Sequence, residues 1–178
     1  MNSSTVAALT VLFTLCACTE RHASSRVKDD PFLTAPAHLS YNVKVLFTDS
    51  SYTKAILYAG EARLFEDRQM TTLGKSVKVD FYPRTGKQRA AQLTSDSAVV
   101  DDRTRNMTAI GNVRVHSDSS RSTLTTQRLI WMNATQRIRS DDPVRIVTPT
   151  EVIEGVGFES DQFLTSYRIF KVKGVHRP

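Results

Sequence analysis

The residues of this sequence best suited to chemistry are two cysteines near its start. Cys16 and Cys18 stand one residue apart and no other cysteine follows, which excludes a disulfide framework in the rest of the chain. A C-x-C pair can bind a metal, but no histidine or second cysteine pair lies at the spacing of a zinc site. We therefore expect no metal, and the neighbours of the cysteines suggest another role.

Paired carboxylates could serve as a general acid and base, and Asp101-Asp102 and Asp141-Asp142 are the candidates. Each pair stands between alternating apolar segments, where a hairpin would turn, and aspartate is a common turn residue. The histidines are scattered along the chain: His22, His38, His116 and His176. No nucleophile elbow, H-E-x-x-H motif, P-loop or dinucleotide fingerprint occurs. We predict a protein that is not an enzyme and has no cofactor.

The cysteines end an apolar run that begins at Val6. The run is too short for the roughly 20 residues of a membrane-spanning helix, but it is typical of a signal-peptide core. Its end, Leu15-Cys16-Ala17-Cys18, resembles the bacterial lipobox. This resemblance implies that residues 1–17 are a lipoprotein signal peptide and that Cys18 carries two acyl chains. Residues 1–17 lack the usual Lys or Arg, and a plain secretory signal without lipid is the alternative.

Residues 18–38 are polar and predict a flexible tether, followed by a single domain over residues 39–178. The chain has 24 Lys and Arg against 18 Asp and Glu, so its net charge of +6 favours anionic partners. Phospholipid headgroups and phosphorylated glycolipids fit this charge. We expect no nucleic acid as a partner, because no Lys/Arg cluster with interleaved aromatic residues is present.

The predicted domain shows alternation of period two, typical of β-strands, and no convincing helical period. In TAIGNVRV, for example, Val113 and Val115 alternate with polar residues. A shift of about 31 residues takes Val113 to Val144 and then to Val175. Such a repeat predicts stacked antiparallel hairpins and an all-β fold. Alternation alone does not distinguish a packed core from an open groove.

Several short motifs follow one another along the predicted domain: an Ala- and Asp-bearing strand over residues 91–99, Gly111-Asn112-Val113-Arg114-Val115, Leu124-Thr125-Thr126, Gly155-Val156-Gly157-Phe158 and Val172-Lys173-Gly174. Over about residues 40–175 they resemble the LptC/OstA-like family of lipopolysaccharide-transport proteins. The resemblance implies a twisted, V-shaped β-jellyroll. It also implies a role without chemistry, in which lipopolysaccharide passes from an inner-membrane ABC transporter along a periplasmic bridge of like-folded proteins. The lipobox departs from family members that carry a transmembrane helix.

Under this resemblance the alternating apolar residues are candidates for a lipid-binding groove: Val45, Phe47, Tyr58, Val79, Phe81, Val113, Val115, Trp131, Val144, Ile146, Phe158 and Ile169. Ordinary core packing is the alternative for each. Candidate partner-binding edge strands carry Tyr41, Val43, Tyr167, Phe170 and Val172. Arg114, Arg145 and Lys173 are candidates for contact with lipid phosphates or, alternatively, belong to a solvated strand face.

We expect the protein in the periplasm, anchored by lipid to a membrane, the inner membrane rather than the outer. Two other functions stay open. One is a surface-anchored β-sandwich lipoprotein that binds protein or glycan without carrying lipid. The other is a periplasmic lipoprotein with a structural role in the envelope.

Overall fold

The computed structural model describes residues 35–49, 52–85 and 88–177, and their strands form one antiparallel sheet. The elements are β1 (His38–Asp49), β2 (Tyr52–Phe65), the 3-10 turn η2 (Glu66–Arg68), β3 (Met70–Phe81), β4 (Ala91–Ser95), β5 (Ser97–Asp101), β6 (Met107–Ser117), β7 (Thr123–Met132), β8 (Arg137–Val147), β9 (Val152–Asp161) and β10 (Tyr167–His176). The predicted all-β fold of stacked antiparallel hairpins is confirmed.

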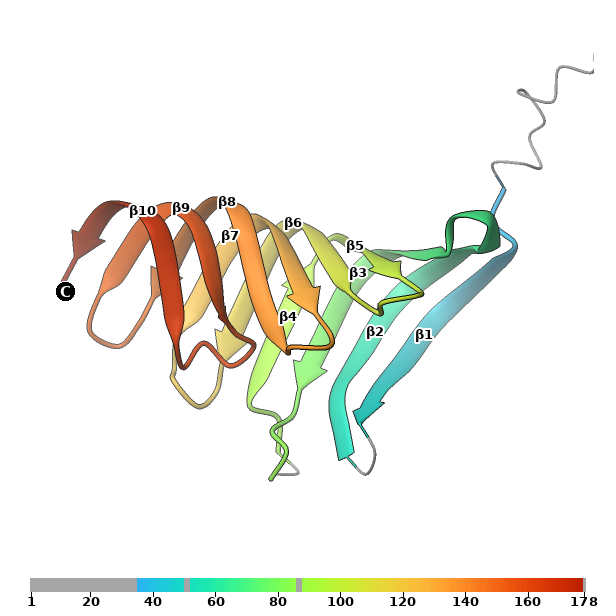
Figure 1. The fold of residues 1–178 in the computed structure, drawn as a ribbon, viewed down its shortest axis with the longest axis horizontal. Coiled ribbons are helices and arrows are strands. Elements are labelled where there is room, and N and C mark those ends of the chain that lie inside the picture. The colour runs from blue at the N-terminus through green and yellow to red at the C-terminus, as the bar shows by residue number, and fades with distance from the viewer. Residues whose placement is uncertain (1–34, 50–51, 86–87, 178) are drawn as a thin grey trace, which may run out of the picture. The chain divides into compact units, whose positions relative to one another are not determined.

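Almost every strand lies beside its neighbour in the sequence. The order across the sheet is β1-β2-β3-β4-β6-β7-β8-β9-β10, and β5 continues the position of β4 by pairing with β3 and β6. β1 and β10 each pair with one strand and lie at opposite ends of the stack (Figure 1). The sheet therefore has two free edges, one at each end.

A line of β-bulges crosses the middle of the long strands. The pairing register shifts after Ala59 in β2, after Ile110 in β6, after Thr126 in β7 and after Ser140 in β8. A bulge bends its strand and increases the local twist. Neighbouring strands bulge at matching heights, so each of these strands consists of two straight segments joined by a bend. The single sheet therefore folds over its own apolar face.

The bulges account for the repeat in the sequence, since one repeat of about 31 residues is two bent strands. They also correct the expectation for Asp141-Asp142. This pair lies in the bulge of β8 and not in a hairpin turn. Asp101, in contrast, does hold a turn, because its Oδ1 accepts a hydrogen bond of 2.7 Å from the backbone N–H of Thr104.

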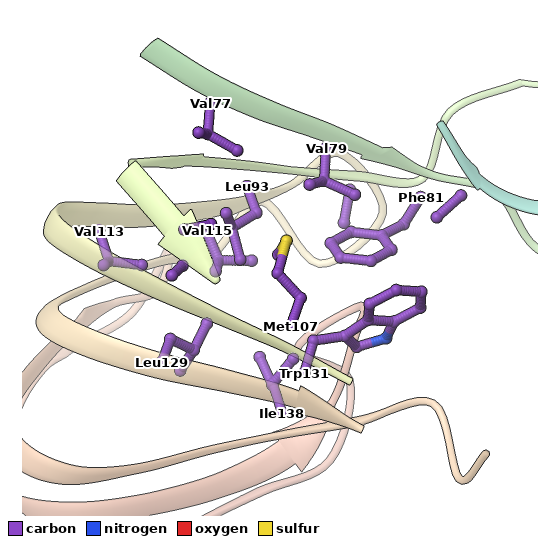
Figure 2. Packing of buried hydrophobic residues seen from close by; sticks show 14 of the residues in the cluster. Val77, Val79, Phe81, Leu93, Met107, Val113, Val115, Leu129, Trp131 and Ile138 are labelled. Atoms are coloured by element: carbon purple, nitrogen blue, oxygen red, sulfur yellow. The ribbon is translucent and has the colours of Figure 1, made fainter. Parts of the chain in front are cut away.

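The core lies within the fold of the sheet, around Trp131 of β7. The Trp131 ring meets Phe47 of β1 at 5.0 Å between ring centres and Phe81 of β3 at 5.5 Å, both edge to face. Figure 2 shows Trp131 and Phe81 together beside Met107. The indole N–H donates a 3.0 Å hydrogen bond to Gln162 Oε1, so its polar atom is satisfied. β1 and β7 are distant in the sheet order, and their contact follows from the folding of the sheet.

The bulge in β6 gives a testable prediction about stability. Gly111 has a φ of +78°, and an added Cβ would lie 2.6 Å from Asp96 Oδ2. We expect Gly111→Ala to lower the free energy of unfolding by about 1–3 kcal/mol, because it combines left-handed backbone with a steric clash. Urea denaturation measures this change.

Gly74→Ala in β3 is the matched control, since nothing lies within 4 Å of the added methyl group. We expect it to change the free energy of unfolding by less than about 1 kcal/mol. Equal losses for the two variants would contradict the role assigned to the bulge.

Candidate functional site

Most of the predicted groove residues pack against one another within the folded sheet. Each of the following is no more than 5% exposed: Phe47, Val79, Phe81, Val113, Val115, Trp131, Val144, Ile146 and Phe158. Ile169 is half-buried and packs against this cluster. The sequence thus identified the inward-facing residues, and their role in binding lipid stays a prediction.

Tyr58 is a correction, because it lies on the outer face of β2. Its neighbour Leu57 points inward and is 1% exposed. The Tyr58 ring instead lies beneath the ammonium groups of Lys78, at 4.4 Å, and Lys44, at 5.8 Å. Both faces of this segment are apolar in the sequence, so alternation could not decide which of the two residues points inward.

An apolar cavity remains open at the β1 end of the interior. Its volume is about 330 Å³, at the lower end of the range for ligand pockets. Its apolar lining comes from four strands and consists of Val43, Val45, Leu46, Phe47, Leu57, Ala62, Leu73 and Val100. Phe47 also contacts Trp131, so it separates the cavity from the packed core. Val45 is 39% exposed, which leaves this part of the wall accessible from outside.

Polar residues complete the lining of the same cavity. The Thr71 hydroxyl donates to the Asp102 carboxylate at 3.0 Å, and the Asp102 N–H donates to the Gln69 carbonyl at 2.9 Å. Arg105 also lines the cavity and forms no ion pair within the part of the chain that the structure describes. An apolar lining with a free cation suits a molecule that has a hydrocarbon chain and an anionic group.

Sequence reasoning missed Leu57, Leu73, Val100, Asp102 and Arg105 as lining residues. The inward positions of Leu57 and Leu73 follow from alternation once the pairing of β2 with β3 is known. Asp102 and Arg105 come from the loop after β5, and no pattern in the sequence indicated that this loop borders a cavity.

The predicted partner residues fall into two groups. Tyr41 on β1 is 60% exposed, and on β10 Val172 is 56% and Phe170 is 50% exposed. Val43 is half-buried and lines the cavity, whereas Tyr167 stacks on Phe158 with 6.1 Å between ring centres. Both free edges therefore present large apolar side chains, and contact with a partner stays a prediction.

A charged cluster on β2 and β3 lies beside Tyr41 of β1. The Glu61 carboxylate lies 2.6 Å from Arg63 and 2.9 Å from Lys75, and the Lys75 ammonium lies 5.2 Å from the centre of the Tyr41 ring. The hydrogen bond from Lys75 holds the pKa of Glu61 below its usual range, and the charge of Arg63 adds to this effect. The ion pair between Glu61 and Lys75 joins β2 to β3, and the contact of Lys75 with the Tyr41 ring extends the cluster to β1.

Several predicted features lie outside the described residues. They are the signal peptide, Cys18 and the tether as far as residue 34. Within residues 35–49, 52–85 and 88–177, no helix is long and apolar enough to cross a bilayer. The same residues contain no group of three or more His, Cys, Asp or Glu side chains placed to hold a metal.

A match to a known protein family identifies the family of the chain. The family described as "Lipopolysaccharide-assembly, LptC-related" matches residues 6–176. The chain belongs to the LptC family of lipopolysaccharide-assembly proteins. The family resemblance predicted from the motifs is confirmed, and the family supports a role as a component of lipopolysaccharide transport.

A solved structure supports the fold. LptH of Pseudomonas aeruginosa, described as the LptA homologous periplasmic component of the lipopolysaccharide transport device, superimposes with a TM-score of 0.52 and 13% sequence identity. The match covers 66% of this chain and 82% of the LptH chain. It confirms the β-jellyroll. No curated protein sequence matches the chain significantly.

The cavity gives a prediction about binding of an apolar ligand. We expect the protein to bind a fluorescent fatty acid, and Val45→Asp to weaken that binding about tenfold or more, because the new carboxylate would be desolvated by the acyl chain. Leu39→Asp is the control, since Leu39 is exposed on the same strand but does not line the cavity. Fluorescence titration measures both affinities, and equal affinities would contradict the assigned site.

Proposed function

We propose that the protein accepts the acyl chains of lipopolysaccharide in the cavity beside β1 and passes the lipid onward. One observation carries this proposal: an apolar cavity opens next to a free sheet edge. Val43 and Val45 belong both to the wall of the cavity and to the edge strand. A like-folded protein that paired with β1 would therefore place its own interior beside the cavity.

The cavity must enlarge to hold a lipid with several acyl chains. Each methylene that leaves water contributes about 0.8 kcal/mol, so burial of about ten methylenes contributes about 8 kcal/mol. Removing a phenylalanine from a core costs about 3–5 kcal/mol. One acyl chain thus offsets the displacement of Phe47 from Trp131. β1 is the element that yields, because it pairs with one neighbour and most of its side chains are exposed.

The two edges supply the proposed connections. We place an inner-membrane ABC transporter at one edge as the source of lipopolysaccharide, and a like-folded periplasmic bridge protein at the other. Exposed apolar residues on β1 and β10 support this arrangement, because unpaired backbone groups beside apolar side chains favour the addition of a strand. The transporter supplies the energy for lipid movement, and the protein supplies an apolar site that shields the acyl chains from water.

The proposed location is the periplasm, with a lipid anchor in the inner membrane. The lipobox-like Leu15-Cys16-Ala17-Cys18 supports this anchor, which would replace the transmembrane helix of other family members. Residues 18–38 would then tether the jellyroll to the membrane that contains the transporter.

Photo-crosslinking in cells tests lipid transport. A crosslinking amino acid at Val45 is expected to trap lipopolysaccharide, because this side chain borders the cavity and tolerates a larger group. The same amino acid at Leu39 is expected to trap protein and no lipid, since Leu39 lies on the outer side of the edge. Crosslinks from Val45 to protein alone would overturn lipid transport and favour a protein-binding β-sandwich.

Metabolic labelling with a palmitate analogue tests the anchor. We expect Cys18→Ala to abolish labelling, because this change removes the thiol that takes the lipid. Cys16→Ala, which leaves an acceptable small residue in the lipobox, is expected to label like the unaltered protein. Labelling that survives in Cys18→Ala would refute the anchor while leaving the lipid cavity intact.

A further inference from the structure

A second hollow lies on the outer face of the sheet, and it shares no lining residue with the apolar cavity. Its volume is about 650 Å³. Strand pairing places its central residues in one row, with Arg114 of β6 beside Thr125 of β7, Thr125 beside Arg145 of β8, and Arg145 beside Glu154 of β9. Lys173, in the register shift of β10, completes the row. The bulges of these strands shape the cleft, since several of its other lining residues lie within them.

The outer cleft has an excess of positive charge. Three cations and one carboxylate line it, and Arg145 Nε lies 3.3 Å from Glu154 Oε1. Arg114 and Lys173 form no ion pair with any residue that the structure describes, so their charges face the cleft uncompensated. The Thr125 hydroxyl donates to the Arg145 carbonyl at 3.3 Å, which fixes the backbone in the middle of the row.

We propose that this outer cleft binds a phosphate monoester carried by a larger molecule. Two uncompensated cations match the charge of a phosphate dianion, and the guanidinium of Arg114 can donate two parallel hydrogen bonds to it. Arg114 on β6 and Lys173 on β10 are separated by four strand spacings of about 4.8 Å, or roughly 19 Å, so both long side chains extend inward along the row to contact one phosphate group. The cleft is much larger than a phosphate group, and Gln127 in its lining offers an amide group to an attached sugar or glycerol, whereas the Asn112 amide N–H already donates to Asp96 Oδ2 at 2.8 Å.

The carboxylate of Glu154 sets the strength of this site. It forms an ion pair with Arg145 and repels an incoming phosphate. The cleft of the unaltered protein therefore binds a phosphate monoester weakly and reversibly. This proposal goes beyond lipid carriage in the apolar cavity and does not depend on it, because the two sites have no lining residue in common.

Calorimetric titration of the full chain tests the outer cleft with two probes. Glucose 1-phosphate represents a soluble sugar phosphate, and dihexanoyl phosphatidic acid represents a lipid headgroup. Glucose and dihexanoyl phosphatidylcholine are the uncharged or zwitterionic controls. We expect one or both phosphate monoesters to bind, and the tighter of the two identifies the source of the ligand.

Variants locate the binding. We expect Arg114→Gln with Lys173→Gln to weaken binding of the phosphate monoester by roughly tenfold or more, since each charged hydrogen bond carries about that factor. Glu154→Gln is expected to tighten binding severalfold, because it frees Arg145. The control is Arg128→Gln with Arg168→Gln, which removes the same charge from exposed strand positions outside the cleft lining and should change affinity less than twofold.

Equal losses in the two double variants would overturn the site, because diffuse surface charge would then explain binding. Absence of binding by both phosphate probes would overturn it as well. The fatty-acid affinity of Arg114→Gln with Lys173→Gln should equal that of the unaltered protein, so failure of the outer cleft and failure of the apolar cavity give different results.

Discussion

The line of β-bulges is the constraint on which the rest of the structure depends. Without it the ten strands would form an open twisted sheet, with one apolar face in contact with water. Bulges at matching heights bend β2, β6, β7 and β8 and bring β1 over β7, which lets Phe47, Phe81 and Trp131 meet. The bend also hollows the outer face beside Arg114 and Arg145. The core, the inner cavity and the outer cleft therefore have one origin.

The bend closes the interior along its middle and leaves the ends of the sheet free. A closed barrel would pair its first and last strands and abolish both edges. Here β1 and β10 keep unpaired backbone groups and apolar side chains in contact with solvent. An edge of this kind can pair with a strand of another protein, which would extend the sheet. The two ends differ, because the apolar cavity lies beside β1.

The sequence predicted the fold well because period two and the repeat of about 31 residues both arise from backbone geometry. Each residue such as Val113 or Ile146 points inward for the same reason in every strand, so one pattern identified most of the core. Prediction failed where the two faces of a strand are equally apolar, as at Leu57 and Tyr58. It failed again at Asp141-Asp142, because a bulge and a hairpin turn use the same polar residues.

The candidate sites were harder to predict than the core. The difference between a packed interior and a cavity depends on how far β1 stands from β3 and β5, and side-chain volumes several strands apart determine that distance. Arg105 and Asp102 reach the cavity through a loop that carries no periodic pattern. Arg114, Arg145 and Lys173 were predicted either to contact lipid phosphates or to belong to a solvated strand face, but their convergence on one outer cleft required the register of five strands.

The contact between Phe47 and Trp131 has a consequence for timing. Phe47 lies on β1, an outermost strand of the sheet. Binding of a partner to β1 and movement of the Phe47 ring away from Trp131 are therefore expected to be coupled. Under the proposed function, the isolated protein would accept a single acyl chain in its cavity, whereas a lipid with several acyl chains would enter after a docked partner had moved β1. Such coupling would restrict uptake of the larger lipid to the assembled state.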